Sequence, residues 1–221
     1  MASNRGNRIL SIDLNILHED RFILVISKPG GLLSVPGRGA EKQDCVVSRA
    51  KECYPDLPDQ PAVHRLDMMT SGLMLLARTS TAHRNLVRQF QYRLVLKRYV
   101  AILEGHLEED SGTIELAFRL DPDNRPYQVF DPVNGKQGVT LWRKLATEPS
   151  TTRVEFIPLT GRTHQLRLHA AHPEGLGSPI VGDYLYGSGN DGDQMLLHSN
   201  FISFYHPETN KPCTFSSEPP F

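Results

Sequence analysis

One short segment places a carboxylate where it could take part in a reaction. The run His64-Arg65-Leu66-Asp67-Met68-Met69-Thr70-Ser71-Gly72 sets Asp67 two residues after an arginine and just before a Ser-Gly turn that leads into an apolar stretch. A loop held at the mouth of a strand is a rigid platform for a reacting group. An aspartate in this setting more often caps a turn or pairs with a nearby arginine. The pattern alone therefore leaves a catalytic and a structural interpretation open.

The segments around Asp67 predict the elements that would hold this loop. Short apolar runs rich in β-branched residues and bounded by Gly or Pro are typical of buried strands. Such runs occur at 22–26, 72–77, 99–103, 113–118, 139–145, 153–157, 196–204 and 213–215. Helices are expected over 81–92 and 163–171. Many strands, few helices and no strict alternation predict an α+β domain around a largely antiparallel mixed sheet, flanked by helices and loops.

The helix expected over 81–92 has two different faces. Helical spacing puts Ala82, Leu86, Val87 and Phe90 on the inner side, and Arg84, Arg88 and Gln91 on the outer side. The helix belongs to a longer basic zone, because no acidic residue stands between Asp67 and Glu104 while several cations do. A zone of this kind is typical either of an RNA-contacting surface or of the solvated face of a helix.

Composition narrows the class of protein. With 221 residues, of which 39% are hydrophobic, the chain can bury one core without disulfides or a metal. The expected organisation is an N-terminal extension over 1–18 and one catalytic domain over 19–221. No apolar run resembles a secretory signal or is long enough to span a bilayer, which predicts a cytoplasmic protein that does not enter a membrane. Cys45, Cys53 and Cys213 form no CxxC pair, which indicates reduced structural thiols.

The segment around Asp67 resembles the HRLDxxTSG signature of the RluA family of RNA pseudouridine synthases. Further segments resemble other family motifs in the same order: SKPGGL at 27–32, KRYVA at 97–101, TGRTHQLRLH at 160–169, and PIVGD with YG over 179–187. Segments 33–38 and 124–126 are similar to a family member that lacks the N-terminal S4 RNA-binding domain, and too few residues precede Phe22 to hold one. The segment 170–178 is longer than in that member, so the RNA target stays open.

The resemblance implies a single pseudouridine synthase domain with Asp67, Tyr99 and Arg162 as catalytic residues. Asp67 would be the reacting carboxylate and Arg162 would pair with it, keeping it charged and oriented. The ring of Tyr99 would lie against the uracil, and its hydroxyl could assist removal of the C5 proton. Taken without the resemblance, Arg162 is equally suited to a structural ion pair and Tyr99 to a buried strand.

The resemblance also implies a set of RNA-binding residues. These are Arg65, His64, Leu166, Thr70, Arg84 and Arg88. Leu166 would help to floor the base pocket, although its spacing also suits a core leucine. Arg65 would fill the gap left by a uridine that has been flipped out of its stack, or would simply pair with a surface acid.

The chemistry explains why one carboxylate would suffice. Turning uridine into its C-glycoside breaks the N1–C1′ bond and joins C5 to C1′, through an electron-poor sugar. Asp67 could attack C1′ to form an ester or remove the 2′ proton to form a glycal, and no water is consumed. We expect no metal, because no HxxxH or HExxH spacing occurs, and no nucleotide cofactor, because the Walker pattern is missing.

The expected partner is RNA, either 23S-type ribosomal RNA or a tRNA anticodon stem-loop or both, bound by a monomer. The sequence is compatible with two alternatives. The chain could carry out the same chemistry on a different RNA, or it could be an RNA-binding or folding factor whose catalysis is dispensable.

Overall fold

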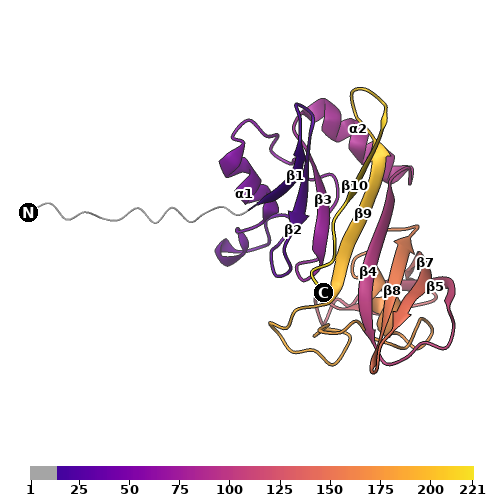
Figure 1. The fold of residues 1–221 in the computed structure, drawn as a ribbon. Helices are drawn as coiled ribbons and strands as arrows, with labels where there is room; N and C mark the ends of the chain where they lie inside the picture. The colour runs from indigo at the N-terminus through magenta and orange to yellow at the C-terminus, as the bar shows by residue number, and fades with distance from the viewer. Residues whose placement is uncertain (1–13) are drawn as a thin grey trace, which may run out of the picture.

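The computed structural model describes residues 14–221, which form one ten-stranded sheet with three α-helices and a short 3-10 helix (Figure 1). The strand order is β1-β2-β3-β9-β4-β8-β7-β5-β6, and β10 pairs with the second half of β9. Among the strands of residues 14–221, only β3 and β9 pair in parallel; the other neighbouring strands are antiparallel. The expected α+β class with a largely antiparallel mixed sheet is confirmed.

The elements follow the chain in this order: β1 Asn15–Glu19, β2 Ile23–Lys28, the 3-10 helix η1 Ala40–Lys42, α1 Val46–Cys53, β3 Ser71–Ala77, α2 Ser80–Gln91, β4 Leu96–Glu104, β5 Ser111–Leu120, β6 Gln128–Phe130, β7 Lys136–Thr147, β8 Thr151–Pro158, α3 Gln165–Ala171, β9 Leu197–Tyr205 and β10 Pro212–Ser216. Every expected strand and helix is present. No helix within residues 14–221 is long and apolar enough to cross a membrane.

Strands β1 and β6, helix α1 and the 3-10 helix η1 were not expected from the sequence. Strands β1 and β6 are short, and β1 buries no residue fully, so neither leaves an apolar run. Helix α1 is capped by Cys45, whose Sγ accepts from the backbone N–H of Ser48 at 3.3 Å, rather than by a usual capping residue. Because β1 pairs with β2, the described part of the sheet begins at Asn15, within the segment 1–18 that was expected to precede the domain. Residues 1–13 lie outside the described part.

The inner face of α2 differs from the expected one at Val87. Val87 is 36% exposed, and Gln89 is buried instead. The side-chain amide of Gln89 donates to the carbonyl of Tyr205 at 2.7 Å, and its Oε1 accepts from the backbone N–H of Tyr205 at 2.8 Å. The expectation that Val87 faces inward is therefore wrong. Gln89 is buried on the inner face instead, because its side chain satisfies the backbone N–H and carbonyl of Tyr205 at the end of β9.

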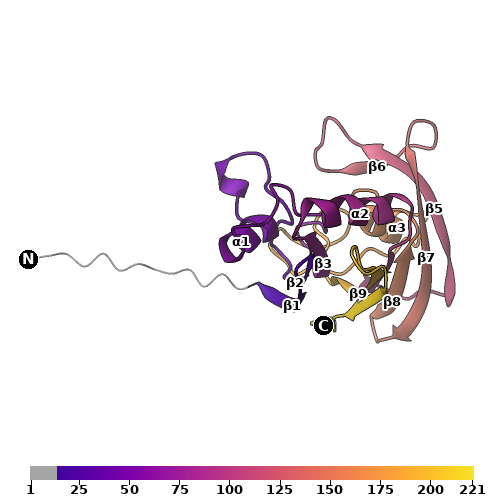
Figure 2. The ribbon, with the colours of Figure 1, turned by 90° about the horizontal axis from the view of Figure 1, so that it is seen from above.

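The sheet divides into two packed regions near the pairing of β3 with β9, and β9 belongs to both: Leu197 packs in the second region, whereas Ile202 and Phe204 pack in the first (Figures 1 and 2). In the first region α1 and α2 cover opposite faces of β2 and β3. In the second, α3 packs against the strands from β4 to β5. The junction needs Gly72, which has a φ of 104° and lies so close to β9 that an added Cβ would stand 2.3 Å from the carbonyl oxygen of Ser199.

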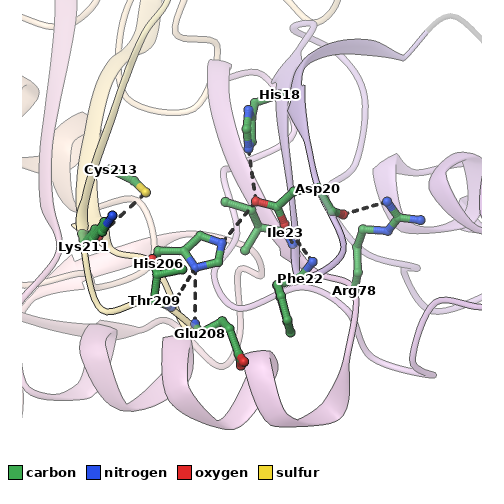
Figure 3. Close-up of polar contacts among 10 residues, drawn as sticks. All are labelled: His18, Asp20, Phe22, Ile23, Arg78, His206, Glu208, Thr209, Lys211 and Cys213. Atoms are coloured by element: carbon green, nitrogen blue, oxygen red, sulfur yellow. Dashed lines mark hydrogen bonds and ion pairs between the residues drawn. The ribbon is translucent and has the colours of Figure 1, made fainter.

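Asp20, in the turn between β1 and β2, ties the first region together (Figure 3). Its carboxylate accepts four hydrogen bonds, from the backbone N–H groups of Phe22 and Ile23 and from the ring Nε2 atoms of His18 and His206. Its carbonyl accepts from Arg78, just after β3. His206 belongs to the turn between β9 and β10, so one aspartate joins three segments that lie far apart in the sequence.

Candidate active site

A cavity of about 800 Å³ opens beside the junction of β3 and β9. Four segments supply most of its lining: residues 63–70 before β3, the connection from α2 to β4, residues 157–163 at the end of β8 and just beyond it, and the first turn of α3. Seven of the predicted site residues line it, namely Asp67, Tyr99, Arg162, Arg65, His64, Leu166 and Thr70. Arg84 and Arg88 are exposed on α2 and do not line it.

The backbone on both sides of Asp67 is held by buried hydrogen bonds. Before it, the hydroxyl of Ser34 accepts from the N–H of Leu66 at 3.0 Å and donates to the carbonyl of Leu66 at 2.7 Å. After it, the carbonyl of Met68 accepts from the backbone N–H of Gly31 at 2.9 Å. The carbonyl of Asp67 itself closes a turn with the N–H of Thr70 at 3.1 Å. The carboxylate is thus carried on a loop with a fixed conformation.

Lys28 is the strongest of these supports. Its side chain is 1% exposed, and its Nζ donates to the carbonyls of Pro29, Leu32 and Met68 at 2.7–2.9 Å. Burial lowers the pKa of Lys28 to about 7, while the charge of Asp67 opposes that shift. An ammonium has three donors and a neutral amine has two, so three carbonyl acceptors favour the charged form. The SKPGGL turn therefore clamps the Asp67 loop.

The carboxylate of Asp67 is available to a bound molecule. Within residues 14–221 it accepts no hydrogen bond and forms no ion pair, and its side chain is partly exposed to the cavity. Its charge nevertheless acts on the groups around it, since it opposes the loss of charge by Lys28 and His164 and raises the pKa of Tyr99. A carboxylate with open lone pairs in a lined cavity can interact with substrate directly.

Arg167 is a second buried cation of the site. Its guanidinium is 3% exposed and forms a two-point contact with Asp183, with Nε–Oδ2 at 2.8 Å and Nη2–Oδ1 at 2.6 Å. Burial works against its charge, but the hydrogen bonds to Asp183 and the charges of Asp183 and Asp67 raise the pKa of Arg167 above its ordinary value. Arg167 therefore stays charged in the wall of the cavity that holds Asp67, with Asp183 as its counter-ion.

Arg162 and Arg65 stand on opposite sides of the same cavity. The expected ion pair between Arg162 and Asp67 is not formed within the described residues; Nε of Arg162 donates instead to the carbonyl of Gln137 at 3.3 Å. Arg65 reaches across to residues 157–163, where its Nη2 lies 3.4 Å from Oγ1 of Thr163. Both guanidinium groups are exposed and can turn toward a ligand.

Tyr99 and Leu166 supply apolar surface inside the cavity. Tyr99 is 9% exposed and stands where the pairing of β4 with β9 shifts register, between Arg98 and Tyr99. Burial raises the pKa of Tyr99 to about 12; the hydroxyl of Ser199 opposes the shift and the charge of Asp67 adds to it. The phenol is therefore neutral near pH 7. Leu166, 8% exposed on α3, belongs both to the core and to the lining.

His64 and Thr70 support the lining of the cavity. Nε2 of His64 accepts from the backbone N–H of Leu75 at 2.9 Å, and the ring stacks on Phe90 with centroids 4.8 Å apart. Burial and the positive charge of Lys97 lower the pKa of His64 to about 3, so the ring is neutral. Thr70 is 3% exposed and closes the turn that begins at Asp67.

Comparison with known proteins agrees with this geometry. The family described as RNA pseudouridylate synthase matches residues 22–172. The chain is 45% identical to the dual-specificity RNA pseudouridine synthase RluA of Pasteurella multocida, over 94% of each protein, and 40% identical to that of Escherichia coli, over 94% of each. The solved structure of human RNA Pseudouridylate Synthase Domain Containing 1 is similar with a TM-score of 0.75 and 28% identity, over 96% of this chain and 86% of that one. The chain belongs to the RluA family of RNA pseudouridine synthases.

An RNA pseudouridine synthase is an isomerase that needs a cavity for one nucleotide and a group that acts on its ribose. Sequence reasoning assigned Asp67 to that role, but gave none to Lys28, Arg167 or Asp183. All three lie within segments that resemble family motifs, which is the signal that could have drawn attention to them. What the sequence did not reveal is which motif residues face substrate and which hold the others in place.

Proposed function

We propose that this RNA pseudouridine synthase isomerises a uridine in a stem-loop shared by large-subunit ribosomal RNA and tRNA anticodon arms, with Asp67 acting on the ribose. The name "dual-specificity" carried by the relatives from Pasteurella multocida and Escherichia coli supports two classes of RNA substrate. The enzyme works as a monomer in the cytoplasm.

The observation that carries the proposal is the open carboxylate of Asp67 in a cationic cavity. The lining contains five cationic side chains, those of Arg65, Arg93, Lys97, Arg162 and Arg167, and among the described residues Asp67 is its one acid. About 800 Å³ is within the range of sites that enclose a small ligand, so one flipped nucleotide can enter. The cations attract the phosphates, and the carboxylate meets the sugar.

The surrounding residues take distinct roles in the reaction. The ring of Tyr99 and the side chain of Leu166 enclose the uracil while the N1–C1′ bond breaks and the base turns to join C5 to C1′. The C5 proton then leaves and N1 ends protonated, so the product is an isomer of the substrate. Arg162 turns from the Gln137 carbonyl toward the reacting nucleotide, and Arg65 fills the place of the flipped base.

Two synthetic RNAs test the proposal directly. Purified enzyme is incubated separately with a tRNA anticodon stem-loop and with a large-subunit ribosomal RNA stem-loop of the same loop sequence, and pseudouridine is mapped chemically at each position. We expect one modified uridine in each RNA. Modification of neither RNA would overturn the proposal, and modification of one alone would limit it to that class. Sedimentation at working concentrations tests the monomer.

A further inference from the structure

The mouth of the cavity carries apolar side chains that the reaction at Asp67 does not use. Leu94 is 55% exposed, Leu96 is 41% exposed and Leu159 is 43% exposed, and all three line the cavity. Leu94 and Leu96 come from the connection between α2 and β4 and the first residue of β4, and Leu159 comes from the opposite wall, just after β8. Exposed leucines scattered over a surface need no explanation, but three leucines on the two walls at the mouth of one cavity indicate a binding surface.

The backbone holds Leu94 in this position. Helix α2 is followed by Arg93 in the left-handed conformation, at φ 59°, and the N–H of Leu94 donates to the carbonyl of Gln89 at 2.9 Å. A hydrogen bond of this kind, from a backbone N–H to the carbonyl five residues before it, closes many helix C-termini. The residue that donates it, here Leu94, ordinarily packs its side chain back on the last turn of the helix. Leu94 remains more than half exposed instead. Its neighbour Val95 is 7% exposed in the core, which fixes the connection on the other side.

The charges around the leucines define their partner. Arg93 stands between the helix and Leu94, and Lys97 follows Leu96. On the opposite wall, Arg162 lies three residues after Leu159. Single-stranded nucleic acid presents this combination to a protein, because its phosphates need cations and its unstacked bases need apolar faces. An apolar protein partner would not require cations beside every leucine.

We propose that Leu94, Leu96 and Leu159 form a subsite for the unstacked bases that flank the target uridine, so that the preferred substrate is a loop opened on both sides of the flipped nucleotide. The subsite rests on the proposed function, because it requires an RNA in the cavity. It makes the fit of the neighbouring bases, and not only their phosphates, part of substrate selection.

Substrates that lack the flanking bases test the subsite. Wild-type enzyme and the triple variant Leu94→Ser, Leu96→Ser, Leu159→Ser are compared on a stem-loop and on the same stem-loop with abasic residues on both sides of the target. We expect wild-type kcat/KM to fall roughly tenfold on the abasic RNA, the value of one or two buried apolar contacts. The triple variant should already be slow on the intact RNA and should lose no more than about twofold on the abasic one.

A matched control and the salt dependence separate the subsite from other roles. Leu145, on β7 away from the cavity and 42% exposed, gives Leu145→Ser, which should behave as wild type on both RNAs. The triple variant should keep the wild-type slope of affinity against salt, because every cation that can meet a phosphate is retained. If the triple variant does not fold, Leu94→Ser alone, at the most exposed position, serves for the same comparison.

Three outcomes would overturn the subsite. Equal losses from the abasic change in wild-type and variant enzyme would mean that the leucines do not contact these bases. A changed salt slope would mean that the substitutions disturb the neighbouring cations. Self-association of the wild-type protein that the triple variant abolishes would assign the leucines to a second copy of the chain. Failure of the proposed function gives a different result from failure of the subsite, because the wild-type enzyme would then form no pseudouridine even in the intact stem-loop.

Discussion

Two aspartates show how the same side chain serves structure in one region and chemistry in the other. Asp20, between β1 and β2, accepts four hydrogen bonds and joins three distant segments (Figure 3). Burial alone would raise the pKa of Asp20, but the hydrogen bonds from Phe22, Ile23, His18 and His206 together lower it. Asp67, at the junction of the two sheet regions, accepts none from residues 14–221, although its loop is held firmly by Lys28 and Ser34.

The difference lies in where the hydrogen bonds go. Around Asp20 the hydrogen bonds end on the carboxylate, so its lone pairs are occupied and the side chain holds the surrounding segments together. Around Asp67 they end on the backbone of Leu66 and Met68, so the loop is fixed while the carboxylate stays open. A residue that acts on substrate can thus be recognised by two features: hydrogen bonds hold its backbone in place, and its side-chain functional group has no partner within the protein. Changing each aspartate should therefore damage a different property.

The largest effect is expected for Asp67→Asn. Because the amide keeps the shape and removes the charge, we expect pseudouridine formation to fall on the order of 10⁴-fold or more. The free energy of unfolding should stay within about 0.5 kcal/mol of wild type, since the carboxylate accepts no hydrogen bond from the folded chain. Single-turnover assays and urea unfolding measure the two quantities. The control is Asp59→Asn, because Asp59 is fully exposed and lies outside the cavity. Turnover by Asp67→Asn in protein free of wild-type enzyme would remove Asp67 from the mechanism.

The next largest effect is expected for Arg65→Ala, and only on RNA that must be opened. If Arg65 takes the place of the flipped uridine, its removal should slow the reaction roughly 100-fold on a folded stem-loop, because extrusion of a stacked base costs a few kcal/mol. On an RNA whose target base is already unstacked the reaction should slow about threefold or less. Rates on the two RNAs are compared under single-turnover conditions. An equal effect on both would show that Arg65 supports the bond changes or the position of Asp67.

The predictable part of the fold is the part with long apolar segments. β2, β3 and β4 were expected because their buried residues form continuous runs, and α2 because its inner residues repeat at helical spacing. β1 was not, because it alternates exposed and half-buried residues and gains its place from pairing with β2. Local periodicity also misplaced the inner face of α2, since Gln89 is buried through hydrogen bonds to Tyr205 on β9.

The sequence predicted seven of the residues that line the cavity, but missed Arg167 and could not show how the site residues contact one another. The motifs around Asp67 and Arg162 brought seven predicted residues into one cavity. The sequence could not show that Arg162 bonds to the carbonyl of Gln137, or that Arg167 is buried and held by Asp183 sixteen residues later. Those contacts depend on how α3 packs against the sheet, which no local pattern encodes.

Asp20→Ala should damage stability and leave catalysis intact. Removing the carboxylate leaves two backbone donors and two histidine donors without their acceptor, which we expect to cost about 2 kcal/mol of unfolding free energy because water can replace part of it. None of these groups lines the cavity, so kcat/KM should change by less than about twofold. Urea unfolding and steady-state kinetics test both parts. A variant that is inactive at full stability would break the contrast with Asp67.

The contribution of Asp20 should also depend on pH in one direction. Its pKa is lower in the folded chain than the ordinary value of 3.8, so the unfolded chain binds its proton more readily. The stabilisation is complete above the unfolded pKa and is lost as the pH falls through the folded pKa. The difference in unfolding free energy between wild type and Asp20→Asn should therefore be constant above about pH 5 and shrink below about pH 4. A difference that grows in acid would contradict the assigned role.

The smallest effect is expected from the exposed arginines of α2. This helix lies in the same region as Asp20, but it follows β3, the strand that the Asp67 loop leads into. Arg84 and Arg88 are exposed outside the cavity, so they can touch RNA only through phosphates beyond the flipped nucleotide. Replacing both with Ala should weaken RNA binding about fivefold, leave the rate at saturating RNA unchanged, and reduce the slope of log affinity against log salt by about 0.7 for each phosphate that is no longer neutralised. Lys51→Ala is the control, because α1 covers the opposite face of β2 and β3. A slope equal to that of wild type would return Arg84 and Arg88 to the solvated face of an ordinary surface helix.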